Sequence, residues 1–161
     1  MVPVGKKIAI KSILLPTDFS ENAKYAMEYA VSFAAQYKAK LYVLHVLVSP
    51  HAMVGYEVAP FVSFERLFAD MKKSAEQAMS TFVPEEVKKE LEVETALVQG
   101  TPFLEILKFA REKEVDLIVI ATHGRTGLSH VLFGSVAEKV VRKSPCPVLS
   151  IRHPEHEFVM P

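Results

Sequence analysis

The chain contains little of what several protein classes depend on. Cys146 is its single cysteine among 161 residues, which excludes an internal disulfide framework and is typical of a reducing compartment. Nineteen acidic side chains balance nineteen basic ones, so no net charge attracts nucleic acid or an anionic membrane. The sequence has neither a signal-peptide-like N-terminus nor an apolar run long enough to cross a membrane. We therefore expect a soluble, cytoplasmic protein that binds neither nucleic acid nor membranes.

Short apolar runs alternate with amphipathic stretches along the sequence. Strands separated by helices, and apolar on both faces, predict a single doubly wound α/β domain with a parallel sheet and helices on both sides. We expect this domain to span residues 1–152, with a loosely held tail at residues 153–161. The predicted strands are residues 8–15, 41–48, 91–98, 115–121 and 148–151, and the predicted helices are residues 20–37, 64–82, 101–112 and a helix after Gly134.

In a doubly wound sheet, ligands bind beyond the carboxyl ends of the strands, where the strand order reverses. The segments expected at that place are residues 16–18, 45–48 and 121–134. Residues 49–62 read as a long connecting loop.

Glycine is scarce, but half of it is concentrated in one place. Three of the six glycines, Gly124, Gly127 and Gly134, lie between an apolar strand and the start of a helix. Backbone N–H groups converge on an anion in such an arrangement, and phosphate is the leading candidate. The alternative is structural, because Ser135 and Glu138 have the spacing of a capping box. The loop has neither the Walker A nor the G-x-G-x-x-G pattern.

Two further positions have two interpretations each. Asp18 follows the first strand, where its carboxylate could accept hydrogen bonds from a ribose or an adenine amine. It could also be the N-cap of the next helix, a role for which Ser20 is equally suited. His45 lies in an apolar strand and is interpreted as a hydrogen-bonded core residue. Arg125 or His130 could meet phosphate oxygens, and these two residues and His123 are at least equally expected to be solvated.

Three stretches resemble the universal stress protein family, in its nucleotide-binding subclass. They are ILLPTDFSENA at residues 13–23, LYVLHV at residues 41–46 and ATHGRTGLSHVLFGSVAEKVVRKSPCPVL at residues 121–149. The family's ATP-binding pattern is glycine, two residues, glycine, nine residues, glycine, then serine or threonine. Gly124, Gly134 and Ser135 match it, and Ala121 replaces the first glycine. At a strand end with ordinary dihedral angles, this alanine should be tolerated.

The resemblance implies a UspA-like fold of the adenine nucleotide alpha hydrolase type, with five parallel strands in the order 3-2-1-4-5. It also implies a homodimer that pairs through residues 148–151. The implied cofactor is ATP, or ADP or AMP, with any Mg²⁺ or Mn²⁺ carried by the phosphates. The nucleotide-binding residues, partly read from the loop itself, are Pro16, Thr17, Asp18, Val46, Ile120, Ala121, Gly124, Arg125, Gly127, Gly134, Ser135 and Val136.

The function implied is that of an ATP-binding regulator of the stress response, with a protein partner that the sequence does not identify. Slow ATP hydrolysis or autophosphorylation, for example at Ser135, is the enzymatic alternative. The glycine loop supplies one arginine, no lysine and no evident base, so efficient phosphoryl transfer is not expected and no catalytic residue is assigned. A ligand-free dimeric interaction module is the third possibility.

Overall fold

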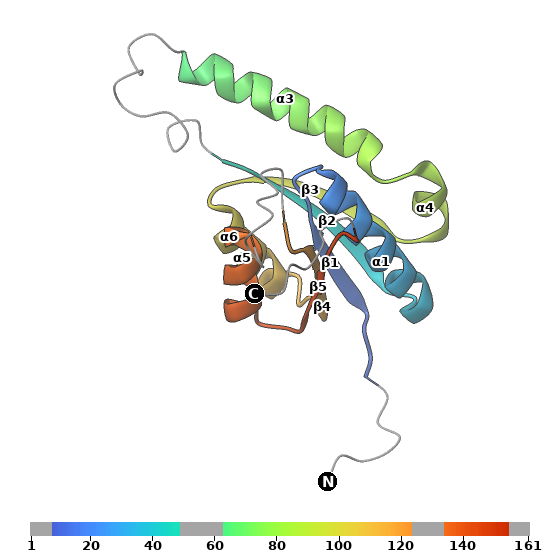
Figure 1. Ribbon diagram of the computed structural model, residues 1–161. Coiled ribbons are helices and arrows are strands. Elements are labelled where there is room, and N and C mark those ends of the chain that lie inside the picture. Colours follow the sequence, from blue (N-terminus) through green and yellow to red (C-terminus); the bar gives the residue numbers. More distant parts are fainter. Residues whose placement is uncertain (1–7, 49–62, 124–133, 155–161) are drawn as a thin grey trace.

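The computed structural model describes residues 8–48, 63–123 and 134–154, with the side chain of Phe64 left aside. Five parallel strands form one sheet in the order β3-β2-β1-β4-β5, shown in Figure 1. The predicted sheet and its strand order are therefore confirmed. The strands are β1 (Ser12–Pro16), β2 (Lys40–Leu47), β3 (Val93–Gln99), β4 (Leu117–Ala121) and β5 (Val148–Ile151).

Helices cover both faces of this sheet. Helices α1 and α3 pack on one face and helices α5 and α6 on the other. None of the helices in the described part of the chain is both long and apolar enough to span a membrane. The helices are α1 (Glu21–Tyr37), α3 (Phe64–Phe82), α4 (Glu85–Glu90), α5 (Pro102–Glu112) and α6 (Ser135–Lys143).

The central strand β1 shows how the two layers form. Successive strand side chains point to opposite faces, so Ile13 and Leu15 join the core beneath α1, while Leu14 joins the core beneath α5 and α6. All three side chains are fully buried. Helix α1 meets β1 through alanines, whose small side chains let the helix lie close to the sheet. These are Ala23, Ala26, Ala30 and Ala34.

The first strand begins later than the sequence predicts, at Ser12 instead of residue 8. Ser12 is opposite Lys40, the first residue of β2, and the Lys40 N–H donates to the Lys11 carbonyl at 2.9 Å. For residues 8–10, no neighbouring strand in the described chain offers a hydrogen-bonding partner. The apolar Ile8 is accordingly 81% exposed.

Helix α4 was not predicted. Pro84 ends the preceding helix as expected, but six further residues then form a short helix that starts at Glu85. The Leu91 N–H donates to the Val87 carbonyl at 2.9 Å and closes α4. This bond keeps Leu91 out of the sheet, so β3 begins at Val93.

The order of the strands defines the place for a ligand. Strand β1 pairs with β2 on one side and with β4 on the other. From β1, the strands β2 and β3 follow on one side of the sheet, and β4 and β5 follow on the other side. The crossover helices therefore separate at the carboxyl ends of β1 and β4, which leaves a crevice between them.

Candidate functional site

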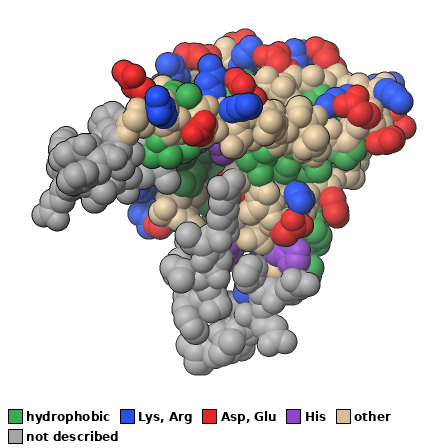
Figure 2. All heavy atoms as spheres, turned by 90° about the horizontal axis from the view of Figure 1, so that it is seen from above, with side chains coloured by type: hydrophobic (Ala, Val, Ile, Leu, Met, Phe, Trp, Pro, Cys, Tyr) green, Lys and Arg blue, Asp and Glu red, His purple; other side chains and the backbone are tan. Residues whose placement is uncertain are grey.

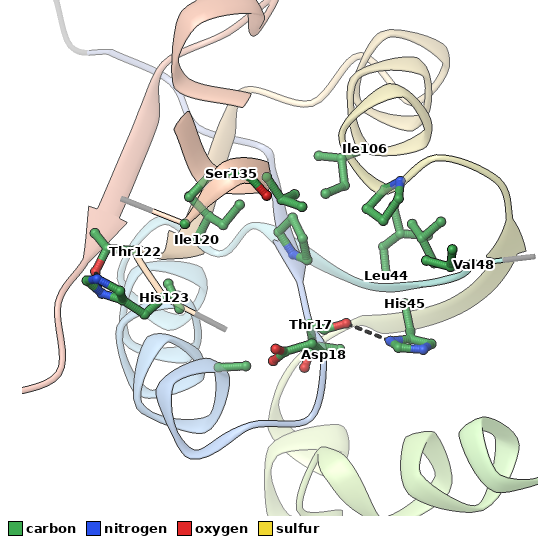
Figure 3. A pocket seen from close by; sticks show the side chains of 18 of the residues that line it. Thr17, Asp18, Leu44, His45, Val48, Ile106, Ile120, Thr122, His123 and Ser135 are labelled. Atoms are coloured by element: carbon green, nitrogen blue, oxygen red, sulfur yellow. Dashed lines mark hydrogen bonds between the residues drawn. The ribbon is translucent and has the colours of Figure 1, made fainter. Parts of the chain in front are cut away.

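A cavity of about 380 Å³ lies in this crevice. The space-filling view shows hydrophobic side chains gathered in a band that leads into a hollow, with charged side chains spread over the outer part of the face (Figure 2). Strands β1, β2 and β4 and the starts of α5 and α6 form its walls (Figure 3). The lining residues are Pro16, Thr17, Asp18, Ala23, Leu44, His45, Val46, Leu47, Val48, Met71, Pro102, Ile106, Ile120, Ala121, Thr122, His123, Gly134, Ser135, Val136 and Ala137.

All the predicted site residues in the described part of the chain line this one cavity. They are Pro16, Thr17, Asp18, Val46, Ile120, Ala121, Gly134, Ser135 and Val136. The other three, Gly124, Arg125 and Gly127, lie outside the described residues, as do His130 and the predicted loop at residues 49–62.

The turn between β1 and α1 is held by one hydrogen bond to β2 and by contacts within the turn. The Thr17 N–H donates to the Leu44 carbonyl of β2 at 2.8 Å. Phe19 has a left-handed backbone with φ of 64°, which is uncommon for a residue other than glycine. Its N–H donates to Thr17 Oγ1 at 3.0 Å, and its ring lies 4.4 Å from the His45 ring. These contacts hold the unusual conformation and fix the turn at the cavity.

Asp18 supports the start of α1 indirectly. The N-cap is Ser20, whose Oγ accepts a hydrogen bond from the Ala23 N–H at 3.2 Å. Asp18 Oδ1 in turn accepts the Ser20 N–H at 3.0 Å and the Ser20 hydroxyl at 2.6 Å. The interpretation of Asp18 as the N-cap is therefore wrong. Its carboxylate is held by Ser20 at the border of the cavity (Figure 3).

The start of α6 forms the opposite wall of the cavity. Gly134 is the N-cap and Ser135 the first helical residue, and no side chain of the described chain caps this end. The capping-box interpretation is wrong, because the Glu138 N–H bonds to the Gly134 carbonyl at 3.0 Å and the Glu138 carboxylate lies 3.2 Å from Arg142 Nη2. A helix N-terminus carries roughly half a positive charge. It can therefore stabilise an anion in the cavity.

Two backbone hydrogen bonds fix α6 relative to the sheet. The Thr122 N–H donates to the Ile151 carbonyl at 2.8 Å, which continues the pairing of β4 with β5. The Gly134 N–H donates to the Thr122 carbonyl at 2.6 Å. The helix N-terminus is thus attached directly to the end of β4.

Apolar side chains cover much of the remaining cavity wall. Leu44, Val46, Ile106 and Ile120 all belong to the core cluster beneath α5 and α6, and they reach the cavity with their outer ends. Such a wall suits a flat, weakly polar ring.

The sequence interpretation missed the contributions of three helices to this wall. Ile106 and Pro102 come from α5, Met71 comes from α3 and Ala23 comes from α1. These residues belong to helical patterns that also predict ordinary packing on the sheet. Nothing in their spacing separates a wall residue from a core residue.

Two histidines border the cavity, and both have hydrogen-bonding partners. His45 Nδ1 lies 2.7 Å from the Thr17 carbonyl; because a carbonyl only accepts, Nδ1 carries the hydrogen. His123 is buried, with Nδ1 3.0 Å from Thr122 Oγ1, so the solvated interpretation is wrong for it. Among the described residues, no cluster of three or more His, Cys, Asp or Glu side chains is placed to hold a metal ion.

Comparisons with known proteins agree with this geometry. The model of the universal stress protein family matches residues 9–152. The universal stress protein MJ0531 of Methanocaldococcus jannaschii is 33% identical in an alignment of 153 residues, which covers 91% of this chain and 85% of the relative.

Solved structures are similar as well. MJ0577 of the same organism superimposes with a TM-score of 0.79 at 32% identity, covering 91% of this chain and 98% of that one. A universal stress protein in complex with cAMP superimposes with a TM-score of 0.58 at 25% identity, covering 90% and 98% of the two chains. The chain belongs to the universal stress protein family.

Proposed function

We propose that this protein binds an adenine nucleotide, with ATP as the leading candidate, and acts as a nucleotide-dependent regulator in the stress response. One observation carries the proposal. A carboxylate at Asp18, an apolar wall and the start of α6, which no described side chain caps, border a single cavity at the point where the strand order reverses. These three features suit the ribose, the adenine ring and the phosphates of a nucleotide, in that order.

Each part of the cavity wall suits one part of the nucleotide. The adenine ring would lie against Leu44, Val46 and Ile120, where burial of apolar surface is favourable. The ribose hydroxyls would donate to the Asp18 carboxylate, and the phosphates would meet the N–H groups at the start of α6. A metal ion would arrive with the phosphates. The cAMP complex of a relative supports the nucleotide class, because cAMP holds the same base and ribose.

The described cavity wall also supports binding without rapid cleavage. Its titratable side chains are Asp18, His45 and His123, and no lysine or arginine is among its described residues. Phosphoryl transfer requires neutralisation of the charge that develops on the phosphate oxygens. Slow autophosphorylation is the second candidate, because Ser135 is exposed at the cavity with its hydroxyl beside the proposed phosphate position. Mass spectrometry after incubation with ATP would detect that product.

Isothermal titration calorimetry with ATP, ADP, AMP and cAMP tests the main proposal. Ser135→Asp is the most informative variant, because an acidic residue in the first turn stabilises a helix by about 0.3–1 kcal/mol but repels phosphate. We expect the thermal stability of this variant to be kept or raised and its affinity for ATP to fall at least about tenfold, or 1.4 kcal/mol.

Ser32→Asp is the matched control for this variant. Ser32 is exposed in the middle of α1 and does not line the cavity, so the same change of charge should leave ATP affinity within about twofold. Absence of binding heat for all four nucleotides at millimolar concentration would refute the proposal, and the ligand-free module would replace it.

We also propose that the protein is cytoplasmic and that two copies pair through β5. The Ile118 and Thr122 N–H groups of the β4 side donate to the carbonyls of Pro147 and Ile151 at 3.0 and 2.8 Å. Because neighbouring residues in a strand point their backbone groups in opposite directions, those of Val148 and Ser150 face the open edge of the sheet. Such an edge is suited to pairing with another strand.

A further inference from the structure

Helix α1 carries aromatic side chains at every fourth position from Tyr25 to Tyr37. We name Tyr25, Tyr29, Phe33 and Tyr37 the aromatic flank of α1. The rings of Tyr25 and Tyr29 meet edge to face with centroids 5.4 Å apart, and their hydroxyls are 3.2 Å apart. The rings of Phe33 and Tyr37 are stacked at 6.2 Å. Tyr29 and Tyr37 are each 39% exposed, although residues of this type are costly to leave in water.

The charges of α1 border one end of this flank and leave its middle uncharged. At 100° per residue, Glu28 and Lys24 lie about 100° and 140° around the helix from Tyr29. Glu21 and Glu28 lie only about 40° and 60° from Tyr25, and the charge of Glu28 contributes to the pKa of that tyrosine. Glu21 turns its carboxylate to the Lys24 ammonium at 2.6 Å. The hydrogen bond with Tyr29 raises the pKa of Tyr25 above its ordinary value of 10, so this side chain remains neutral. Aromatic residues without charges are typical of the buried centre of a protein interface.

The aromatic flank borders the open edge of the sheet. Helix α1 contacts β5, and the Tyr25 ring lies edge to face on the His153 ring with centroids 5.1 Å apart. His153 follows the end of β5 by two residues. Leu149 of β5, which packs in the core on the α1 side of the sheet, is itself only partly buried.

Strand β5 is too short to hold two copies together alone. Its four residues span only about 13 Å, and two of them direct backbone groups outward. Specific interfaces bury roughly 1,200–2,000 Å² in total, whereas one aromatic side chain contributes about 150–250 Å². Pairing through β5 therefore requires side-chain surface next to the strand.

Symmetry determines which surface that is. Two antiparallel β5 strands in one continuous sheet are related by a twofold axis perpendicular to the sheet, so each face continues into the same face of the second copy. The β5 side of α1 then faces the β5 side of the other α1. Uncharged aromatic rings are self-complementary across such an axis, because edge-to-face contacts require no partner of opposite charge.

We propose that the aromatic flank of α1 packs against the same flank of a second copy and completes the interface that β5 begins. This inference rests on the proposed β5 pairing. Phe33 and Tyr37 lie toward the C-terminal end of the helix, and Tyr25 and Tyr29 lie nearest the residues that follow β5. The two tyrosines at this end should therefore contribute most.

Analytical ultracentrifugation of the full chain over a concentration series tests the proposal. We expect a dimer for the wild type and a monomer for Ser150→Pro, which removes an outward N–H of β5. Replacing Tyr25 and Tyr29 by alanine together should raise the dimer dissociation constant at least about thirtyfold, as truncation of interface tyrosines commonly does. Replacing both by phenylalanine should change the dissociation constant less than about threefold.

Matched controls separate the outcomes. Leu104→Ala removes an apolar side chain that is 53% exposed on α5 and should leave dimerisation unchanged. Tyr29→Lys, at a position exposed enough to keep the fold, places like charges across the axis and should also give a monomer. Circular dichroism and ATP titration verify that each variant is folded.

The possible results have distinct meanings. A wild-type dimer that Ser150→Pro dissociates, while the tyrosine variants keep the wild-type dissociation constant, would overturn the role of the aromatic flank and leave β5 pairing in place. A wild-type monomer at all concentrations would overturn both.

Discussion

The two ends of the sheet use polar groups in opposite ways. At the amino ends of the strands, Asp116 Oδ2 accepts the backbone N–H groups of Lys11 and Ser12 at 2.7 and 3.0 Å and lies 3.2 Å from the Ser12 hydroxyl. At the carboxyl ends, Asp18 and the N-terminus of α6 border a cavity. The first carboxylate joins two neighbouring strands, and the second is placed where a ligand can reach it.

The charged side chains differ between the two ends in the same way. Near the amino ends, Lys40 Nζ lies 3.0 and 2.9 Å from the carboxylates of Glu92 and Glu94, and Lys113 Nζ lies 3.0 Å from Glu94. These charges neutralise one another within the chain. We therefore expect changes at the amino ends to alter stability and changes at the carboxyl ends to alter binding.

Asp116→Ala should have the largest effect. The variant leaves two backbone N–H groups without their charged acceptor, and we expect a loss of about 2–3 kcal/mol in the free energy of unfolding. Urea denaturation measures it. Asp70→Ala, at an exposed position of α3, is the matched control and should cost less than about 0.5 kcal/mol. ATP affinity should not change for either variant, and a weakened affinity for Asp116→Ala would break the division between the two ends.

Asp18→Asn should have the converse effect. The amide oxygen can still accept the hydrogen bonds from Ser20, so the loss of stability should remain below about 1 kcal/mol. Replacing a charged acceptor by a neutral one should lower ATP affinity about tenfold, or 1.4 kcal/mol. With 2′,3′-dideoxy-ATP, which lacks the ribose hydroxyls, wild type and variant should bind equally. A tenfold difference that persists with this analogue would place the ribose elsewhere.

Ala121→Gly should change stability more than binding. Ala121 ends β4 opposite Ile151 and is absent from the described residues with positive φ, so its backbone does not require glycine. The substitution should cost about 0.5–1 kcal/mol of stability and change ATP affinity less than about threefold. Tenfold tighter binding would show that the methyl group crowds the nucleotide.

The smallest effect should come from the charges around Glu94. Hydrogen bonds from Lys40 and Lys113 lower the pKa of Glu94 below its ordinary value of 4.5. A carboxyl group whose pKa is lower in the folded state stabilises the fold above pH 4.5, and this contribution is lost as the pH falls through the lowered value. The urea midpoint of the wild type should therefore fall more than that of Glu94→Gln below pH 4.5.

Salt provides the control for this pH effect. The ion pairs are largely exposed and screened by salt, so 1 M NaCl should reduce the difference between wild type and Glu94→Gln. An equal pH dependence in the two proteins at low salt would contradict the assignment.

The sequence predicted correctly those strands and helices whose hydrophobic pattern fits only one kind of secondary structure. Apolar runs such as residues 117–121 are strands buried on both faces, and their alternation with helices led to the correct doubly wound parallel sheet. The order of its strands has another source. The family resemblance supplied that order, and the alternation of elements alone would have left several arrangements open. Strand boundaries were predicted less accurately where they depend on the neighbouring strand. Strand β1 begins at Ser12 because its partner β2 begins opposite, at Lys40.

The sequence did not predict the site correctly where one pattern fits two local structures. Asp18 and Ser20 could not be separated as helix caps, because both are suited to the position and only the three-dimensional turn selects Ser20. The capping box at Ser135 failed for the opposite reason, since the spacing is correct but the helix begins at Ser135, one residue earlier than the motif requires. Met71 and Ile106 were missed because cavity and core residues share the same helical period.

The hydrogen bond from the Gly134 N–H to the Thr122 carbonyl has an evolutionary consequence. It joins two points that are twelve positions apart along the chain, and both points are already fixed, one by the pairing of β4 with β5 and the other by α6. We therefore expect that insertions, deletions and substitutions between them leave the register of the sheet unchanged. A protein engineer could then exchange this stretch between family members as a cassette.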